Sequence, residues 1–207
     1  MGFYEDNLEI IEQIKRHPEI VKELYQLHKD MTSYRLVGRS RRKNGRAFYS
    51  AHRQTPSGVH LGIKTGENMC LELEIATFHF LYDRFPSLRP NCPQVIALLD
   101  TDREEKRRYQ THWTVVMEDF SESQTLNVSD CEHISPAIAS ICSKPLCEYE
   151  LENAIFLISD GTNLEFKVGD LGSLYPHIKK EFQREIIQIA GSAYANSRLE
   201  ALVIPRK

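Results

Sequence analysis

The sequence lacks the cysteine pattern of a disulfide-rich or zinc-binding protein. Its five cysteines are an odd number and widely scattered, with no CxxC pair and no His/Cys cluster at zinc spacing. This usage is typical of reduced thiols, so we expect a cytoplasmic protein. The opening residues MGFYEDNLEI hold no apolar signal-peptide core, and no apolar run approaches the roughly 18 residues of a membrane span. We therefore expect neither a signal peptide nor a membrane partner.

A strong charge of either sign is also missing. The 26 Lys and Arg residues nearly balance the 29 Asp and Glu residues, which leaves a formal net charge of −3. No global basic field favours a nucleic-acid partner. The hydrophobic share of 41% is that of ordinary globular proteins, and 207 residues suffice for one domain of two lobes or for two small abutting domains.

Hydrophobic periodicity divides the first part of the chain into helices and strands. Residues 5–30 have apolar side chains at helical spacing, interrupted by Pro18, which predicts two helices or one kinked helix. Three short β-prone runs follow from Tyr34, namely YRLVGRS, GRAFYSAH and VHLGIKTG. A helix is predicted over 67–85, and two further strands over PQVIALLDTD and THWTVVMEDF. The expected order is three strands, a helix and two strands.

The second part begins with a change of composition. Residues 121–135 have low hydrophobicity and turn-forming side chains, so we expect a boundary there. A short helix around 135–143, a hairpin of AIFLIS and LEFKVGDLG around the Asp160-Gly161 turn, and a final helix around 177–200 follow. The predicted organisation is an N-terminal helical extension over 1–33, an N-lobe over 34–120 and a reduced C-lobe over 121–207.

Four residues occur in the order that transfer of phosphate from a nucleotide requires. This reaction needs a cation on the nucleotide phosphates, an acidic group that holds the cation, oxygen ligands for Mg²⁺ and a residue that orients the acceptor hydroxyl. Lys64 lies in a predicted strand, and Glu74 lies in the helix after it. Asn153 precedes a strand, and Asp170 ends the next one. Ordinary alternatives exist: a solvated strand lysine, Glu72 in place of Glu74, and turn residues at the other two positions.

These residues and the stretches around them resemble the protein-kinase-like fold, most closely the aminoglycoside and choline kinase-like phosphotransferases. ELEIATFHFLYDRFP resembles the helix that carries the glutamate in these kinases. HWTVVMEDF resembles their fifth strand and hinge, and ENAIFLISDGTNLEFKVGDLG resembles the catalytic-loop Asn, a hairpin and the Asp-x-Gly magnesium motif. The resemblance covers about residues 34–172. It implies an α+β fold with a five-stranded antiparallel N-lobe sheet, one packed helix and a reduced, mainly helical C-lobe.

The resemblance also implies an activity, in which the γ-phosphoryl group of ATP moves to a hydroxyl acceptor. Carried over residue by residue, it implies that Lys64 pairs with the α/β phosphates and that Glu74 holds it. Asn153 and Asp170 would bind Mg²⁺. The adenine would face the backbone of the hinge residues Glu118, Asp119 and Phe120. The partner is then an unidentified hydroxyl acceptor or a protein.

The chain departs from the family pattern in three places. The glycine-rich loop keeps only Gly38 and Gly45, and the basic residues around them either contact phosphate or form a solvated turn. In the catalytic loop, PLCEYELEN puts Glu148 where the family has Asp, and Glu150 and Glu152 compete for that role. The chain is also too short for the substrate-binding helices of ordinary kinases. The alternative function is therefore a catalytically impaired pseudokinase that acts as a protein-binding or scaffold module.

Other enzyme classes have weaker signals in the sequence. Glu165-Phe166-Lys167 after Asp160 superficially matches the Asp…Glu-x-Lys signature of some nucleases, but this Asp is too close to the triplet and the charge balance argues against DNA. No GxSxG elbow occurs, and no HxH or HxxxH pair suggests a metal site.

Overall fold

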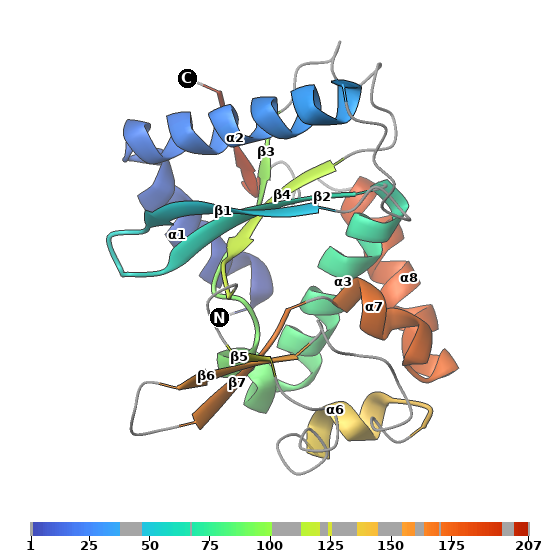
Figure 1. Ribbon diagram of the computed structural model, residues 1–207. Helices are drawn as coiled ribbons and strands as arrows, with labels where there is room; N and C mark the ends of the chain where they lie inside the picture. Colours follow the sequence, from blue (N-terminus) through green and yellow to red (C-terminus); the bar gives the residue numbers. More distant parts are fainter. Residues whose placement is uncertain are drawn as a thin grey trace.

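The computed structural model shows a mixed α+β fold (Figure 1). It describes residues 2–37, 47–66, 68–100, 113–120, 124–125, 136–144, 155–159, 164–169, 171–195 and 201–206. A five-stranded sheet, a three-stranded sheet and the helices packed against them make up the fold. The predicted α+β class is therefore confirmed.

Two helices open the chain, as the periodicity around Pro18 predicts. They are α1 (Phe3–Lys15) and α2 (Pro18–Val37), and Pro18 takes the first helical position, where its missing N–H is not needed. Because α2 continues to Val37, the strand predicted at YRLVGRS is wrong for residues 34–37, while residues 38–40 lie outside the described residues. The physical reason is that extending a formed helix costs little, and no Gly or Pro interrupts α2 after Pro18.

The larger sheet has the strand order β1-β2-β4-β3-β8. Its strands are β1 (Ala47–Gln54), β2 (His60–Gly66), β3 (Ile96–Leu99), β4 (Trp113–Glu118) and β8 (Val203–Ile204). The pairs β1–β2, β2–β4 and β3–β4 are antiparallel, but β3 and β8 are parallel. The prediction of a fully antiparallel five-stranded sheet is therefore wrong. The fifth strand comes from residues 203–204 and not from YRLVGRS.

Long-range contacts hold β8 in the sheet. The N–H of Leu98 donates to the carbonyl of Leu202 at 2.9 Å, and the N–H of Asp100 donates to the carbonyl of Ile204 at 3.2 Å. The hydroxyl of Tyr25, on α2, donates to the same Ile204 carbonyl at 2.6 Å. Leu202 and Ile204 are fully buried. A run this short has no measurable period, so the sequence alone could not predict the strand.

Helices cover both faces of the larger sheet (Figure 1). His28 of α2 contacts Thr114, with Nδ1 and Oγ1 2.8 Å apart. On the other side, α3 (Asn68–Arg84) contacts Lys64, whose register partner on β4 is Val115. Since Thr114 and Val115 are consecutive residues of one strand, their side chains point to opposite faces. α2 therefore covers one face of the sheet, and α3 covers the other.

The smaller sheet has the order β5-β6-β7 and contains the predicted hairpin. Its strands are β5 (Gln124–Thr125), β6 (Ile155–Ser159) and β7 (Leu164–Val168), and β6 and β7 pair antiparallel. The remaining elements are α6 (Pro136–Ile141), α7 (Leu171–Leu174), α8 (Lys180–Ala195) and the 3-10 segments η2 (Pro86–Asn91) and η4 (Tyr175–His177). Helix α8 packs against α3, where the ring centroids of Phe80 and Phe182 are 5.5 Å apart. Helices and strands from both parts of the chain thus share one hydrophobic core.

Candidate functional site

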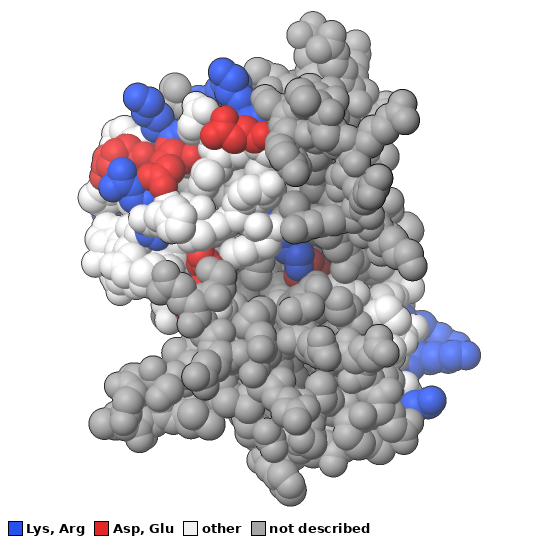
Figure 2. All heavy atoms as spheres, viewed as in Figure 1, with Lys and Arg blue, Asp and Glu red and all other residues white. Residues whose placement is uncertain are grey.

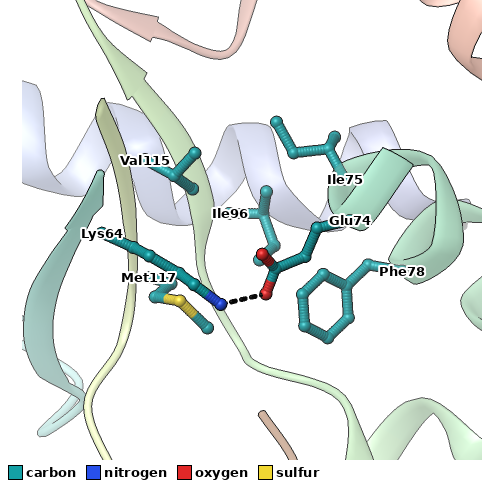
Figure 3. A pocket seen from close by; sticks show the side chains of 7 residues that line it. All are labelled: Lys64, Glu74, Ile75, Phe78, Ile96, Val115 and Met117. Atoms are coloured by element: carbon teal, nitrogen blue, oxygen red, sulfur yellow. Dashed lines mark hydrogen bonds and ion pairs between the residues drawn. The ribbon is translucent and has the colours of Figure 1, made fainter. Parts of the chain in front are cut away.

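Lys64 and Glu74 form a buried ion pair between β2 and α3 (Figure 3). Nζ of Lys64 lies 2.6 Å from Oε1 of Glu74, and the two side chains are only 10% and 4% exposed. This is a charge-assisted hydrogen bond, the stronger kind of polar contact in proteins. The sequence predicts these residues as partners from ten positions apart, and the structure brings them together.

The periods of strand and helix explain why the two side chains meet. On β2, Lys64 lies on the same face as its register partner Val115. On α3, Glu74 and Phe78 are one helical turn apart, so both point toward this face of the sheet (Figure 3). The side chain of the competing Glu72 lies outside the described part of the chain. The ion pair shows that Glu74 is a carboxylate partner of Lys64.

A small cavity lies beside this ion pair (Figure 3). Its remaining lining is apolar and consists of Ile75, Phe78, Ile96, Val115 and Met117. The cavity volume of about 10 Å³ is room for roughly one water molecule. An apolar wall lowers the local dielectric constant, so the charges of the pair act more strongly here than they would in water. A lysine ammonium in such a place can attract one anionic group, such as a phosphate oxygen.

The aromatic ring of Phe48 covers Gly62, the residue of β2 that comes two positions before Lys64 and lies on the same face of the sheet. A Cβ atom added at Gly62 would lie 2.2 Å from Cζ of Phe48, so the ring rests on β2 only because residue 62 is glycine. Phe48 is 37% exposed, and its register partner is Lys64, which places the ring on the Lys64 face. The sequence analysis missed this contact. The available signal was a glycine inside a strand, which often marks close approach of another group.

The three predicted hinge residues lie at the end of β4 and directly after it. Glu118 is the last residue of β4 and pairs with Leu61 of β2. The N–H of Asp119 donates to the carbonyl of His60 at 2.8 Å, and Phe120 is buried. Contact of adenine with the N–H of Asp119 would therefore require this hydrogen bond to break. The predicted role of the hinge backbone stays a prediction.

A second buried ion pair links the end of β4 to the smaller sheet. Nζ of Lys167, on β7, lies 3.6 Å from Oε2 of Glu118, and the two side chains are 7% and 12% exposed. Burial raises the pKa of Glu118, and the charge of Lys167 and a hydrogen bond from Gln94 partly offset this effect. From the sequence, the only chemical role considered for Lys167 is that of a nuclease lysine, which would place its ammonium group at a phosphate. Its burial against Glu118 gives it a different partner.

The other predicted site residues, Glu148, Asn153 and Asp170, lie outside the described residues, as does the predicted glycine-rich loop. The nearest paired positions in the chain are Ile155 and Val168, which are register partners at one end of the β6–β7 hairpin. Within the described ranges, no group of three or more His, Cys, Asp or Glu side chains is placed to hold a metal ion. The Mg²⁺ ligands and the orienting carboxylate therefore stay predictions.

Comparisons of the chain with models of protein families, with curated proteins and with solved structures gave no match. Among the described residues, no helix combines the length and apolar character needed to cross a bilayer. The function of the protein must therefore be inferred from the residues of the site themselves.

Proposed function

We propose that the protein is a kinase-like phosphotransferase that moves the γ-phosphoryl group of ATP to a hydroxyl acceptor. The observation that carries the proposal is the ion pair of Lys64 and Glu74, 2.6 Å long and buried beside a small cavity. Burying two charges is costly, and hydrophobic residues of similar size are often as stable in such places. A buried lysine held by a carboxylate is the arrangement that phosphoryl transfer uses to bind nucleotide phosphates.

Each residue has a defined task in this proposal. Lys64 binds the α/β phosphates, and Glu74 keeps its ammonium group at the edge of the cavity. Asn153 and Asp170 hold Mg²⁺, which supplies neutralisation of charge on the phosphates when it is bound. Glu148 orients the acceptor hydroxyl. The Lys64–Glu74 pair fits the phosphate-binding part of this task, because the ammonium group lies at a cavity and its countercharge is in place.

The second candidate function is a pseudokinase scaffold, and three observations favour it. The cavity of about 10 Å³ has no room for an adenine ring, and Phe48 lies on β2 over Gly62 on the same face. The presence of Glu148 where related kinases have Asp points the same way. In this function the fold is retained for protein contact, and the ion pair keeps α3 against the sheet.

Binding of Mg·ATP tests the proposal. Wild-type protein, Lys64→Met and the control Lys22→Met, which changes an exposed lysine of α2, are compared in thermal unfolding and by calorimetric titration. At about 100 times Kd, Mg·ATP should stabilise the wild type by roughly 2.7 kcal/mol. That stabilisation corresponds to a rise of about 5–11 °C in Tm for a chain of this size. Lys22→Met should behave as the wild type does, and Lys64→Met should show no shift.

A second variant, Asp170→Asn, tests the proposed binding of Mg²⁺. Asp170→Asn should abolish the Mg²⁺-dependent part of nucleotide binding and leave the Tm of the free protein nearly unchanged. Absence of any Mg·ATP binding by the wild type over a wide concentration range would exclude the phosphotransferase and favour the scaffold. Binding without formation of ADP, followed by ³¹P NMR, would place the protein among nucleotide-binding pseudokinases.

A further inference from the structure

Lys167 is a buried lysine outside the set of residues that the proposed chemistry uses. Its Nζ lies 3.6 Å from Oε2 of Glu118. The same carboxylate oxygen accepts a hydrogen bond from the backbone N–H of Gln94 at 2.7 Å. One carboxylate therefore connects the end of β4, the segment that leads into β3, and strand β7.

This contact joins the two sheets at a particular point. β4 belongs to the five-stranded sheet, and β7 belongs to the three-stranded sheet. The residue after Lys167 is Val168, a buried residue whose register partner is Ile155. From this paired end the chain continues through Gly169 to Asp170 and, on the other strand, reaches back toward Asn153. The ion pair thus anchors a strand end whose paired residues, Ile155 and Val168, are each two positions in the sequence from a predicted magnesium ligand.

The physics of a buried ion pair suits a role in positioning. The cost of removing both charges from water offsets most of their attraction, so such a pair adds little net stability. Loss of one partner, in contrast, leaves the other charge buried and uncompensated, and this penalty keeps the pair in one arrangement. An apolar contact at the same place would tolerate sliding of β7 against β4.

We propose that Lys167 is a positioning residue: through its ion pair with Glu118, it fixes β7, the strand from which the chain continues to Asp170, against the end of β4. This inference rests on the proposed function, because it concerns the metal side of the same site. Lys167 touches neither nucleotide nor metal in this scheme. Its effect passes through the strand that carries the chain to Asp170.

The test measures ATP affinity with Mg²⁺ and with EDTA for each variant of the full chain. In Lys167→Met, the gain in affinity that Mg²⁺ provides should fall by about 10–100-fold, the usual effect of losing a residue that orients a metal ligand. Affinity for ATP in EDTA should stay within about threefold of the wild type, because Lys64 is unaffected. Lys167→Arg keeps the charge and should restore most of the Mg²⁺ effect.

A matched control removes a lysine of the same part of the chain whose side chain donates to a backbone carbonyl. Lys179 donates to the carbonyl of Ser140 at 2.6 Å, so Lys179→Met should leave the Mg²⁺ effect unchanged. A merely structural loss in Lys167→Met would weaken binding equally in Mg²⁺ and in EDTA. If the wild type gains affinity from Mg²⁺ and Lys167→Met gains just as much, the positioning role is overturned while the proposed function stands.

Hydrogen exchange distinguishes failure of the proposed function from failure of the positioning role of Lys167. Amide exchange over residues 164–168 should be faster in Lys167→Met than in the wild type or Lys179→Met, with exchange in β2 unchanged. If the wild type binds no nucleotide, the proposed function is wrong, and so is the predicted effect of Lys167 on Mg²⁺-dependent binding. Amide exchange over residues 164–168 then remains as the test of whether Lys167 holds β7 in place. Equal exchange over 164–168 in Lys167→Met and the wild type would then overturn the positioning role as well.

Discussion

The buried pair of Lys64 and Glu74 makes a quantitative prediction about stability. Lys64→Met should lower the free energy of unfolding by about 3–5 kcal/mol, because it leaves the Glu74 carboxylate, only 4% exposed, without the ammonium group of Lys64. Glu74→Leu should cost a similar amount, since it leaves the Lys64 ammonium group buried beside apolar side chains. The double variant should lie within about 1 kcal/mol of the wild type, because it removes both charges together.

Urea unfolding at pH 7 provides the assay, followed by far-UV circular dichroism and by the fluorescence of the single tryptophan, Trp113 in β4. The four proteins form a double-mutant cycle, and the pair predicts a coupling of more than about 2 kcal/mol. Single variants that cost less than about 1 kcal/mol would refute the buried pair, because that is the range of exposed ion pairs. A double variant destabilised by the sum of the singles would refute the coupling. The double variant should also bind no Mg·ATP although it folds with nearly the stability of the wild type. This result would show that the charges of Lys64 and Glu74 are needed for nucleotide binding and not for folding.

Three further predictions concern other parts of the fold. Gly62→Ala should cost about 1–3 kcal/mol in urea unfolding, because the new methyl group meets the Phe48 ring, and the same change should cost less in a Phe48→Ala background; equal costs would contradict the contact. Burial raises the pKa of Glu118 above its ordinary 4.5 against the opposing charge of Lys167, so the stability it contributes is present below that pH and is lost as pH rises through the folded pKa. The free energy of unfolding of the wild type relative to Glu118→Gln should therefore fall as the pH rises from 4.5 through the folded pKa. Parallel curves of stability against pH would contradict the raised pKa of Glu118. Burial raises the pKa of Cys92 from 9.0 to about 12 and that of Cys142 to about 11, so alkylation at pH 8 should be about a thousandfold and about a hundredfold slower than in the unfolded protein, as mass spectrometry of the labelled peptides would show.

Several elements could be predicted because neighbouring residues in the sequence determine them. The break at Pro18 follows from the missing N–H of proline, and the β6–β7 hairpin follows from two apolar runs around a turn. The partnership of Lys64 and Glu74 was expected from the resemblance to kinase-like phosphotransferases, and the packing of a strand against the helix after it allows the contact. Its two residues are separated by only ten positions.

The tertiary structure decided the features that depend on residues far apart in the chain. β8 joins the sheet beside β3 because Leu202 and Ile204 find a buried place there, although their short run carries no period of its own. Lys167 meets Glu118 only when the two sheets are brought together. A local pattern determines which face of an element is apolar, but which distant element covers that face depends on packing the whole core, and this is why only the folded chain shows it.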